Sequence, residues 1–105
     1  MTALQIAAYY GHYEILNIMI MYAEKRGEKE KKRLMNKLNE KSEMSALSYA
    51  ILNNRSECAS LLIVQQVQLY YDRSDSQKDL SPIFICVSKQ NIKLLELMYY
   101  KGYLR

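Results

Sequence analysis

Apolar residues recur along the chain at helical spacing, in short stretches separated by polar turns. Near the N-terminus, Leu4, Ala7 and Ala8 stand three and four positions apart, as one face of an α-helix requires. Thr2 is a good N-cap, and Gly11 can end the helix in the left-handed conformation. After this turn comes a second, wider apolar stripe, formed by Ile15, Leu16, Ile18, Met19 and Tyr22. The pattern predicts a short helix, a tight turn and a longer helix.

The same unit occurs three times. Each copy opens with a hydroxyl residue, at Thr2, Ser45 and Ser81, and has an aliphatic residue two positions on and a small residue five positions on. The register then holds without gaps for nearly twenty positions. Two short helices cannot bury an apolar face alone, so such units must stack on one another. We therefore expect an all-α domain of antiparallel helix pairs.

These residues resemble the ankyrin repeat, whose signature runs Thr-Pro-Leu-His, two Ala, Gly-His, then Glu-Ile-Val ahead of a Leu pair. The first copy matches it most closely, at Thr2, Leu4, Ala7, Ala8, Gly11, His12, Glu14, Ile15, Met19 and Ile20. The resemblance implies one domain over 1–105, a helix-loop-helix solenoid with three degenerate repeats at about 1–23, 44–68 and 80–102. A charged insertion at about 24–43 follows the first repeat.

The copies depart from the family pattern in three respects. The His of the first helix is replaced by Gln5, Ser48 and Phe84, so the hydrogen-bond network that it makes in the family cannot be carried over. The turn Gly before the Thr is replaced by Glu43 and Asp79. The copies also start 43 and 36 residues apart, against roughly 33 in the family. The additional residues are expected in loops on one face of the stack.

The insertion carries the whole net charge of +4. Residues 24–41 contain eight Lys or Arg and four Glu, whereas the rest of the chain has seven residues of each sign. Leu34, Met35 and Leu38 can dock a short helix onto the stack, and Glu28 and Lys32 form a favourable i,i+4 pair. Two interpretations stay open: a solvated, salt-bridged segment, or a patch for an acidic protein, nucleic acid or membrane surface. The lack of aromatic residues among the basic ones argues against a nucleic-acid groove.

The sequence predicts no catalytic residue, no cofactor and no metal site. Cys58 and Cys86 lie inside apolar helical patterns without a close partner, and are expected to be buried free thiols. His12 coincides with the Gly-His of the repeat, which gives it a structural role near the loop. Phosphate loops, dinucleotide fingerprints and paired metal ligands are missing from the sequence. We expect a protein that is not an enzyme.

The apolar runs are far shorter than the roughly 20 residues that a membrane span requires, and no secretory signal is recognisable. A soluble, cytoplasmic protein is the expectation. The chain starts at the cap of one helix and stops soon after another, without a polar capping repeat. From this we expect a piece of a longer array, which as an isolated fragment is marginally stable and associates end to end.

A protein partner is the expected ligand, with no small-molecule substrate. The resemblance places the two positions after the Ala pair on the concave face, where Tyr9 and Tyr10, two of the ten tyrosines of the chain, would supply contact area. The candidate partner-binding residues, including two before the caps, are Tyr9, Tyr10, Met44, Leu52, Asn53, Leu80, Ser88 and Lys89. We predict an interaction module or scaffold. The alternatives are a regulatory or targeting segment of a larger enzyme whose catalytic domain lies elsewhere, and an adaptor acting through the basic insertion.

Overall fold

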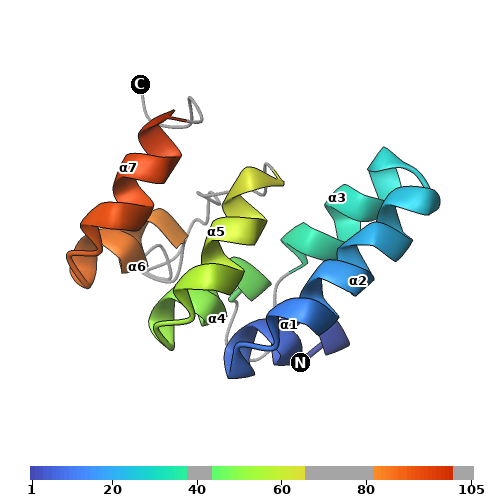
Figure 1. Ribbon diagram of the computed structural model, residues 1–105, viewed down its shortest axis with the longest axis horizontal. Coiled ribbons are helices and arrows are strands. Elements are labelled where there is room, and N and C mark those ends of the chain that lie inside the picture. Colours follow the sequence, from blue (N-terminus) through green and yellow to red (C-terminus); the bar gives the residue numbers. More distant parts are fainter. Residues whose placement is uncertain (38–43, 66–81, 101–105) are drawn as a thin grey trace, which may run out of the picture.

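The computed structural model describes residues 1–37, 44–65 and 82–100, and within these ranges the regular structure is entirely α-helical (Figure 1). The helices are α1 (Ala3–Tyr10), α2 (Tyr13–Lys25), α3 (Glu28–Asn36), α4 (Ala46–Leu52), α5 (Ser56–Val64), α6 (Pro82–Ser88) and α7 (Ile92–Tyr100). The all-α fold predicted from the repeated pattern is confirmed.

Three helix pairs stack side by side. α1 pairs with α2, α4 with α5 and α6 with α7, and the second pair lies between the other two. The first helices α1, α4 and α6 form one layer, while α2, α5 and α7 form the layer in front of it in Figure 1. The turns inside the three pairs therefore lie at the same edge of the stack. Six of the eight predicted binding residues, Tyr9, Tyr10, Leu52, Asn53, Ser88 and Lys89, fall at this edge.

The first helix of each pair ends in the same left-handed turn. The turn residue is Gly11, Asn54 or Gln90, with φ of 76°, 61° and 54°. In each copy the next backbone N–H bonds to the carbonyl five residues back, from His12 to Ala7 at 2.9 Å, Arg55 to Ala50 at 2.8 Å and Asn91 to Cys86 at 3.0 Å. This pattern satisfies carbonyls that the helix end would leave unpaired. The repeats thus keep one backbone geometry although only the first has the glycine.

The predicted N-caps form where the structure describes them. Thr2 Oγ1 accepts a hydrogen bond from the Gln5 amide at 3.2 Å, and Gln5 Oε1 accepts one from the Thr2 amide at 2.9 Å, which completes a capping box. Ser45 Oγ caps α4 by accepting from the Ser48 amide at 3.2 Å. Ser81, the predicted cap of the third copy, lies outside the described residues.

The core runs through the stack along the small-residue positions of the first helices. Ala7, Ala50 and Cys86 occupy equivalent places, and all three are buried. Their small side chains let α4 approach α1 on one side and α6 on the other. Larger apolar residues close the core around them, and the fully buried ones include Leu4, Leu16, Ile20, Leu47, Ile51, Leu62, Ile63 and Met98.

The wide apolar stripe of α2 is divided by the packing. Leu16 is buried and Met19 partly so, whereas Ile15, Ile18 and Tyr22 are exposed. Only the side of α2 that faces the rest of the stack is covered. An apolar strip on its outer side stays open to solvent.

The basic insertion forms the short docked helix that the sequence predicts. Met35 of α3 is buried in the core and Leu34 packs against it, while Leu38 lies outside the described residues. The hydrogen bond from Gln5 Nε2 to the Lys37 carbonyl, at 2.9 Å, joins the end of this segment to α1. Gln5 occupies the place of the family His, so a different polar group here links the first helix to its surroundings.

The charges of α3 pair differently from the expected Glu28–Lys32 contact. Lys31 Nζ lies 2.7 Å from Glu24 Oε1 and donates to Gln65 Oε1 at 2.6 Å, with the lysine buried. These contacts join α3 to α2 and to the end of α5. A second pair, Arg33 with Glu30, forms on the exposed side of α3, and its hydrogen bond lowers the pKa of Glu30 and raises that of Arg33. The salt-bridged interpretation of this segment agrees with these contacts.

Candidate partner-binding surface

The ends of the three first helices form a row along one edge of the stack (Figure 1). We call this row the turn surface and define it by the predicted residues Tyr9, Tyr10, Leu52, Asn53, Ser88 and Lys89. Each pair of residues precedes the left-handed turn of its repeat, so one backbone geometry positions all three pairs. Neighbouring repeats bring these residues together although they are about forty positions apart in sequence.

Tyr10 is the aromatic group that this surface offers to solvent. Its side chain is 55% exposed, while Tyr9 is half-buried. The Tyr9 ring contacts Tyr10 edge-on at 4.8 Å and Tyr49 of the next repeat at 5.8 Å. Tyr10 also stacks on His12, with 6.1 Å between the ring centres. Tyr9 is therefore a link between repeats that supports Tyr10, and His12 has the structural place near the loop that the repeat pattern implies.

One cation of the second repeat and one of the third each donate a hydrogen bond to the repeat before it. Arg55 Nε donates to the Tyr9 carbonyl at 3.2 Å, and Lys89 Nζ donates to the Leu52 carbonyl at 3.1 Å. Tyr9 and Leu52 are equivalent positions at the C-terminal ends of α1 and α4, where the helix dipole is negative. Each cation keeps further N–H donors for other ligands. Sequence reasoning assigned neither contact, because both depend on how adjacent repeats are spaced.

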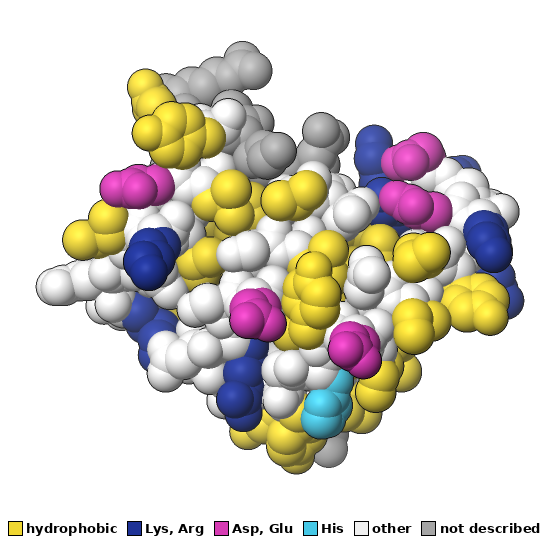
Figure 2. All heavy atoms as spheres, in the orientation of Figure 1, with side chains coloured by type: hydrophobic (Ala, Val, Ile, Leu, Met, Phe, Trp, Pro, Cys, Tyr) yellow, Lys and Arg dark blue, Asp and Glu magenta, His cyan; other side chains and the backbone are white. Residues whose placement is uncertain are grey.

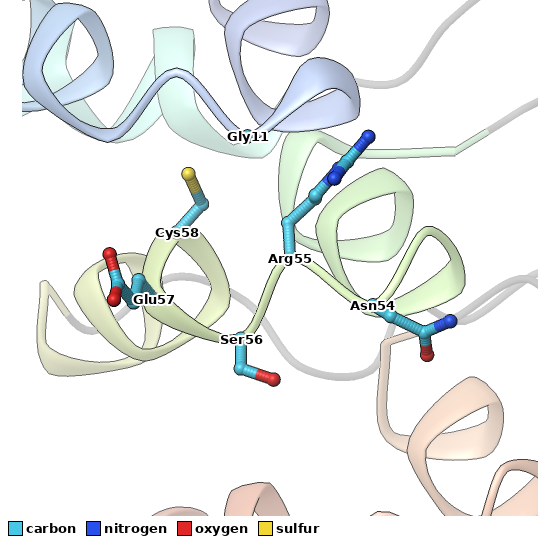
Figure 3. A pocket seen from close by; sticks show the side chains of 6 residues that line it. All are labelled: Gly11, Asn54, Arg55, Ser56, Glu57 and Cys58. Carbon is cyan, nitrogen blue, oxygen red and sulfur yellow. The ribbon is translucent and has the colours of Figure 1, made fainter.

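Arg55 also shapes a shallow pocket of about 330 Å³ beside the first turn. Its side chain extends past Gly11, while Ser56 and Asn54 point away and Cys58 points toward the first repeat (Figure 3). A Cβ at position 11 would lie 2.8 Å from Arg55 Cδ, and φ there is +76°. Glycine adopts this left-handed turn without strain, and any larger residue here would also require the Arg55 side chain to move. The pocket is a product of this contact between repeats.

The other predicted residues differ in how they meet solvent. Leu52, Ser88 and Lys89 are exposed. Asn53 is half-buried, and its Nδ2 donates to the Tyr49 carbonyl at 2.8 Å, which satisfies the end of α4. The accessible part of the turn surface is therefore Tyr10, Leu52, Ser88 and Lys89.

Met44 and Leu80 were expected at finger positions beside this surface. Met44 is only 5% exposed and belongs to the core cluster, so it is not available to a partner. The physical reason is that the residue before an N-cap often packs inward and fixes the entry of the chain into the helix. Leu80 lies outside the described residues.

Two cations lie in the first helices and their turns, while Glu14 and Glu57 follow in the first turns of α2 and α5. The first helices and their turns, residues 3–12, 46–55 and 82–91, contain Arg55 and Lys89 and not a single Asp or Glu. These two cations stand in adjacent repeats on the same edge. A partner with carboxylate or phosphate groups opposite them would be matched in charge.

The thiols offer no reactive site. Cys58 and Cys86 are buried and free, as predicted. Burial raises the pKa of Cys86 to about 11, and burial followed by the nearby Glu57 charge raises the pKa of Cys58. A thiol with a raised pKa holds little of the nucleophilic thiolate at neutral pH. Within the described residues no group of three or more His, Cys, Asp or Glu side chains is placed to hold a metal ion.

Among the described residues, no helix is both long enough and apolar enough to cross a membrane.

The stacked pairs, their shared left-handed turns and the edge that they form define a solenoid of helix-turn-helix repeats. A family model for ankyrin repeats, in three copies, matches residues 4–103. The chain therefore belongs to the ankyrin repeat family. No curated relative and no solved structure matches it significantly. Ankyrin repeats are in general protein–protein interaction modules and are typically non-catalytic, which makes the accessible part of the turn surface its candidate functional site.

Proposed function

We propose that this chain binds a protein partner through the turn surface, with Tyr10 as the aromatic anchor. The observation that carries the proposal is the exposure of Tyr10 on a fixed support. Its ring contacts Tyr9 and His12, and these contacts favour the conformation in which it is presented to a partner. Aromatic anchors of this kind dominate the energetics of many interfaces.

The neighbouring residues specify the chemistry of the partner. Leu52 adds an exposed apolar side chain in the middle repeat, and Lys89 places a positive charge in the third. Arg55 lies between the first two repeats on the same edge. We infer a partner segment that places an apolar side chain near Tyr10 and Leu52 and an acidic group near Arg55 or Lys89.

The basic insertion is less suited to be the primary contact. Its buried lysine, Lys31, is already bound by Glu24 and Gln65, and Arg33 is paired with Glu30. Two of the eight basic side chains of residues 24–41 are therefore paired with acids, and these two attract an acidic partner only weakly. These contacts support a structural role for α3 and leave the turn surface as the better candidate.

The test compares two tyrosines that are both exposed but lie at different places. Partners are captured from the source cell and identified by mass spectrometry. The purified partner is then titrated by calorimetry against the unmodified protein, Tyr10→Ala and Tyr13→Ala. Tyr10→Ala should weaken binding roughly thirtyfold, which corresponds to about 2 kcal/mol. Tyr13→Ala, the same change beside the groove between α2 and α5, should leave the affinity unaltered.

Circular dichroism of both variants separates binding from folding. An unfolded Tyr10→Ala protein would mean that the ring is part of the core and that the surface is wrongly assigned. A folded Tyr10→Ala protein that keeps full affinity would mean that the partner binds at another site. Lys89→Glu provides an independent test. Reversing this charge should weaken the binding of an acidic partner and reduce the salt dependence of that binding.

A further inference from the structure

A shallow groove lies between α2 and α5 on the layer of second helices, and we call it the outer groove. It encloses about 600 Å³. The turn surface, by contrast, is formed by the C-terminal ends of the first helices. The residues that line the outer groove are Tyr13 of α2 and Ser56, Glu57, Ser60, Leu61 and Val64 of α5.

Apolar side chains in the outer groove stay open to solvent although α5 is the middle helix of its layer. Tyr13 is 40% exposed and Val64 is 45% exposed, while Leu61 is half-buried. α5 contacts α2 on one side and α7 on the other. Repeats added at either end of the stack would therefore leave these side chains uncovered, so their exposure belongs to the outer face of the stack.

The lining residues of α5 form one stripe along the helix. Glu57, Ser60, Leu61 and Val64 stand at positions i, i+3, i+4 and i+7, which lie on one helix face. The distance at which two helices pack depends on the side chains at their contact, and the small side chain of Ser60 allows a close approach. A helix with apolar residues at the same spacing is therefore a segment that fits this stripe.

Two carboxylates stand at the end of the groove where α2 and α5 begin. Glu57 lines the groove, and Glu14 occupies the equivalent place in the first turn of α2. Both are exposed, and within the described residues neither forms an ion pair. Figure 2 shows apolar side chains between two acidic ones over the N-terminal parts of α2 and α5.

The nearby cation of α5 does not neutralise these carboxylates. Arg55 stands two positions before Glu57, but the two side chains point apart (Figure 3). Arg55 is directed to the first repeat instead, where its Nε donates to the Tyr9 carbonyl. The negative charge at this end of the groove is thus available to a ligand.

We propose that the outer groove binds a basic amphipathic helix of a partner protein. The apolar stripe of this helix packs on Leu61 and Val64, and a basic residue at its edge pairs with Glu57. An arginine at this place also meets the exposed ring of Tyr13, whose face attracts cations. Charge complementarity selects a cationic helix, because an acidic segment would meet two unpaired carboxylates.

The same charges distinguish this ligand from the other candidates. The phosphate groups of nucleic acids and of anionic lipids would be repelled by Glu14 and Glu57. The partner proposed for the turn surface carries acidic groups, which face Arg55 and Lys89. The two surfaces therefore select segments of opposite charge.

A synthetic peptide tests the outer groove directly. The peptide is about 15 residues long, so that it can form a helix on the protein, with leucine at every third or fourth position and arginine along one edge. A second peptide has glutamate in place of each arginine. Each is titrated into the isotope-labelled protein and followed by NMR spectroscopy. The arginine peptide should bind saturably, with the largest shifts at Tyr13, Glu57, Leu61 and Val64, and the glutamate peptide should not.

Three variants assign the binding to the groove. Glu57→Gln removes one charge at unchanged size and should weaken the arginine peptide roughly two- to fivefold. Tyr13→Ala removes the ring and should weaken it roughly fivefold or more. Glu28→Gln is the matched control, because it makes the same change in the first turn of α3, and the affinity should stay unchanged. Circular dichroism verifies that the variants are folded, and the conservative Glu57→Gln decides if Tyr13→Ala is unstable.

Several results would overturn the proposal. They are a lack of saturable binding of the arginine peptide up to about 1 mM, equal affinity for both peptides, and shifts confined to residues outside the groove. Equal weakening by Glu57→Gln and Glu28→Gln would also overturn it, because the peptide would then respond to net charge alone. The proposed function is tested separately: Tyr10→Ala should leave the peptide affinity unchanged, and Tyr13→Ala should leave binding at the turn surface unchanged.

Discussion

Replacing Gln5 with leucine tests how the insertion is joined to the repeats. Gln5 is only 1% exposed, and its side chain holds two partners at once. Oε1 accepts from the Thr2 amide at 2.9 Å and Nε2 donates to the Lys37 carbonyl at 2.9 Å. Leucine keeps a side chain of similar length and a high helix propensity, but leaves both backbone groups without this partner.

The expected loss of stability follows from these two hydrogen bonds. Each contributes about 0.5–1.5 kcal/mol net, so their removal should cost about 1–3 kcal/mol. Lys37 is exposed, so water can reach its carbonyl, and the apolar leucine offsets part of the loss by burial. A value near 2 kcal/mol is therefore expected, which for a domain of this size lowers Tm by roughly 10 °C.

Urea denaturation followed by circular dichroism at low protein concentration measures this change. Ile6→Leu, at the exposed position next to it, serves as the control and should change stability by less than about 0.5 kcal/mol. Trypsin cleavage after Lys37 in the native protein should also become faster, because the bond that holds this carbonyl is gone. Stability within about 0.5 kcal/mol of the unmodified protein, with unchanged cleavage, would refute the role of Gln5 as the link.

Two further predictions concern the core. Ala50 is fully buried where α4 packs between α1 and α6, so Ala50→Leu should overpack this contact and cost about 1–3 kcal/mol; an unaltered urea midpoint would contradict the repeat register. At pH 8 neither thiol should react readily with a disulfide reagent in the folded protein, since a pKa of about 11 leaves roughly 0.1% of Cys86 as thiolate. Both cysteines should react after unfolding in guanidinium, and immediate labelling of the native protein would show that they are accessible.

The repeat itself could be predicted from local signals. Thr2 and Ser45 act as caps, Gly11 ends the first helix, and Ala7 and Ala50 occupy the tight positions, because capping, left-handed turns and small contacts depend on a residue and its near neighbours in sequence. The docking of Met35 followed from an amphipathic pattern in the insertion. The equal register of the three copies then required stacking, since no pair of helices buries its own apolar face.

The sequence could not assign contacts that join one repeat to another. Arg55 and Lys89 bind carbonyls on the preceding repeat, and Gln5 binds the far end of the insertion, because the distances that allow these bonds are set by how the pairs stack. The sequence around Met44 does not indicate whether this residue is exposed in a loop or buried in the core, where the structure places it.

The division of the apolar stripe on α2 has the same origin. Leu16 and Ile18 are both aliphatic residues of one helix, yet one is buried and the other exposed. Hydrophobic periodicity identifies apolar positions but not which of them a neighbour covers. The local sequence determined the repeat unit, whereas tertiary packing alone decided which faces of that unit became core and which stayed open for another molecule, because burial depends on what lies opposite.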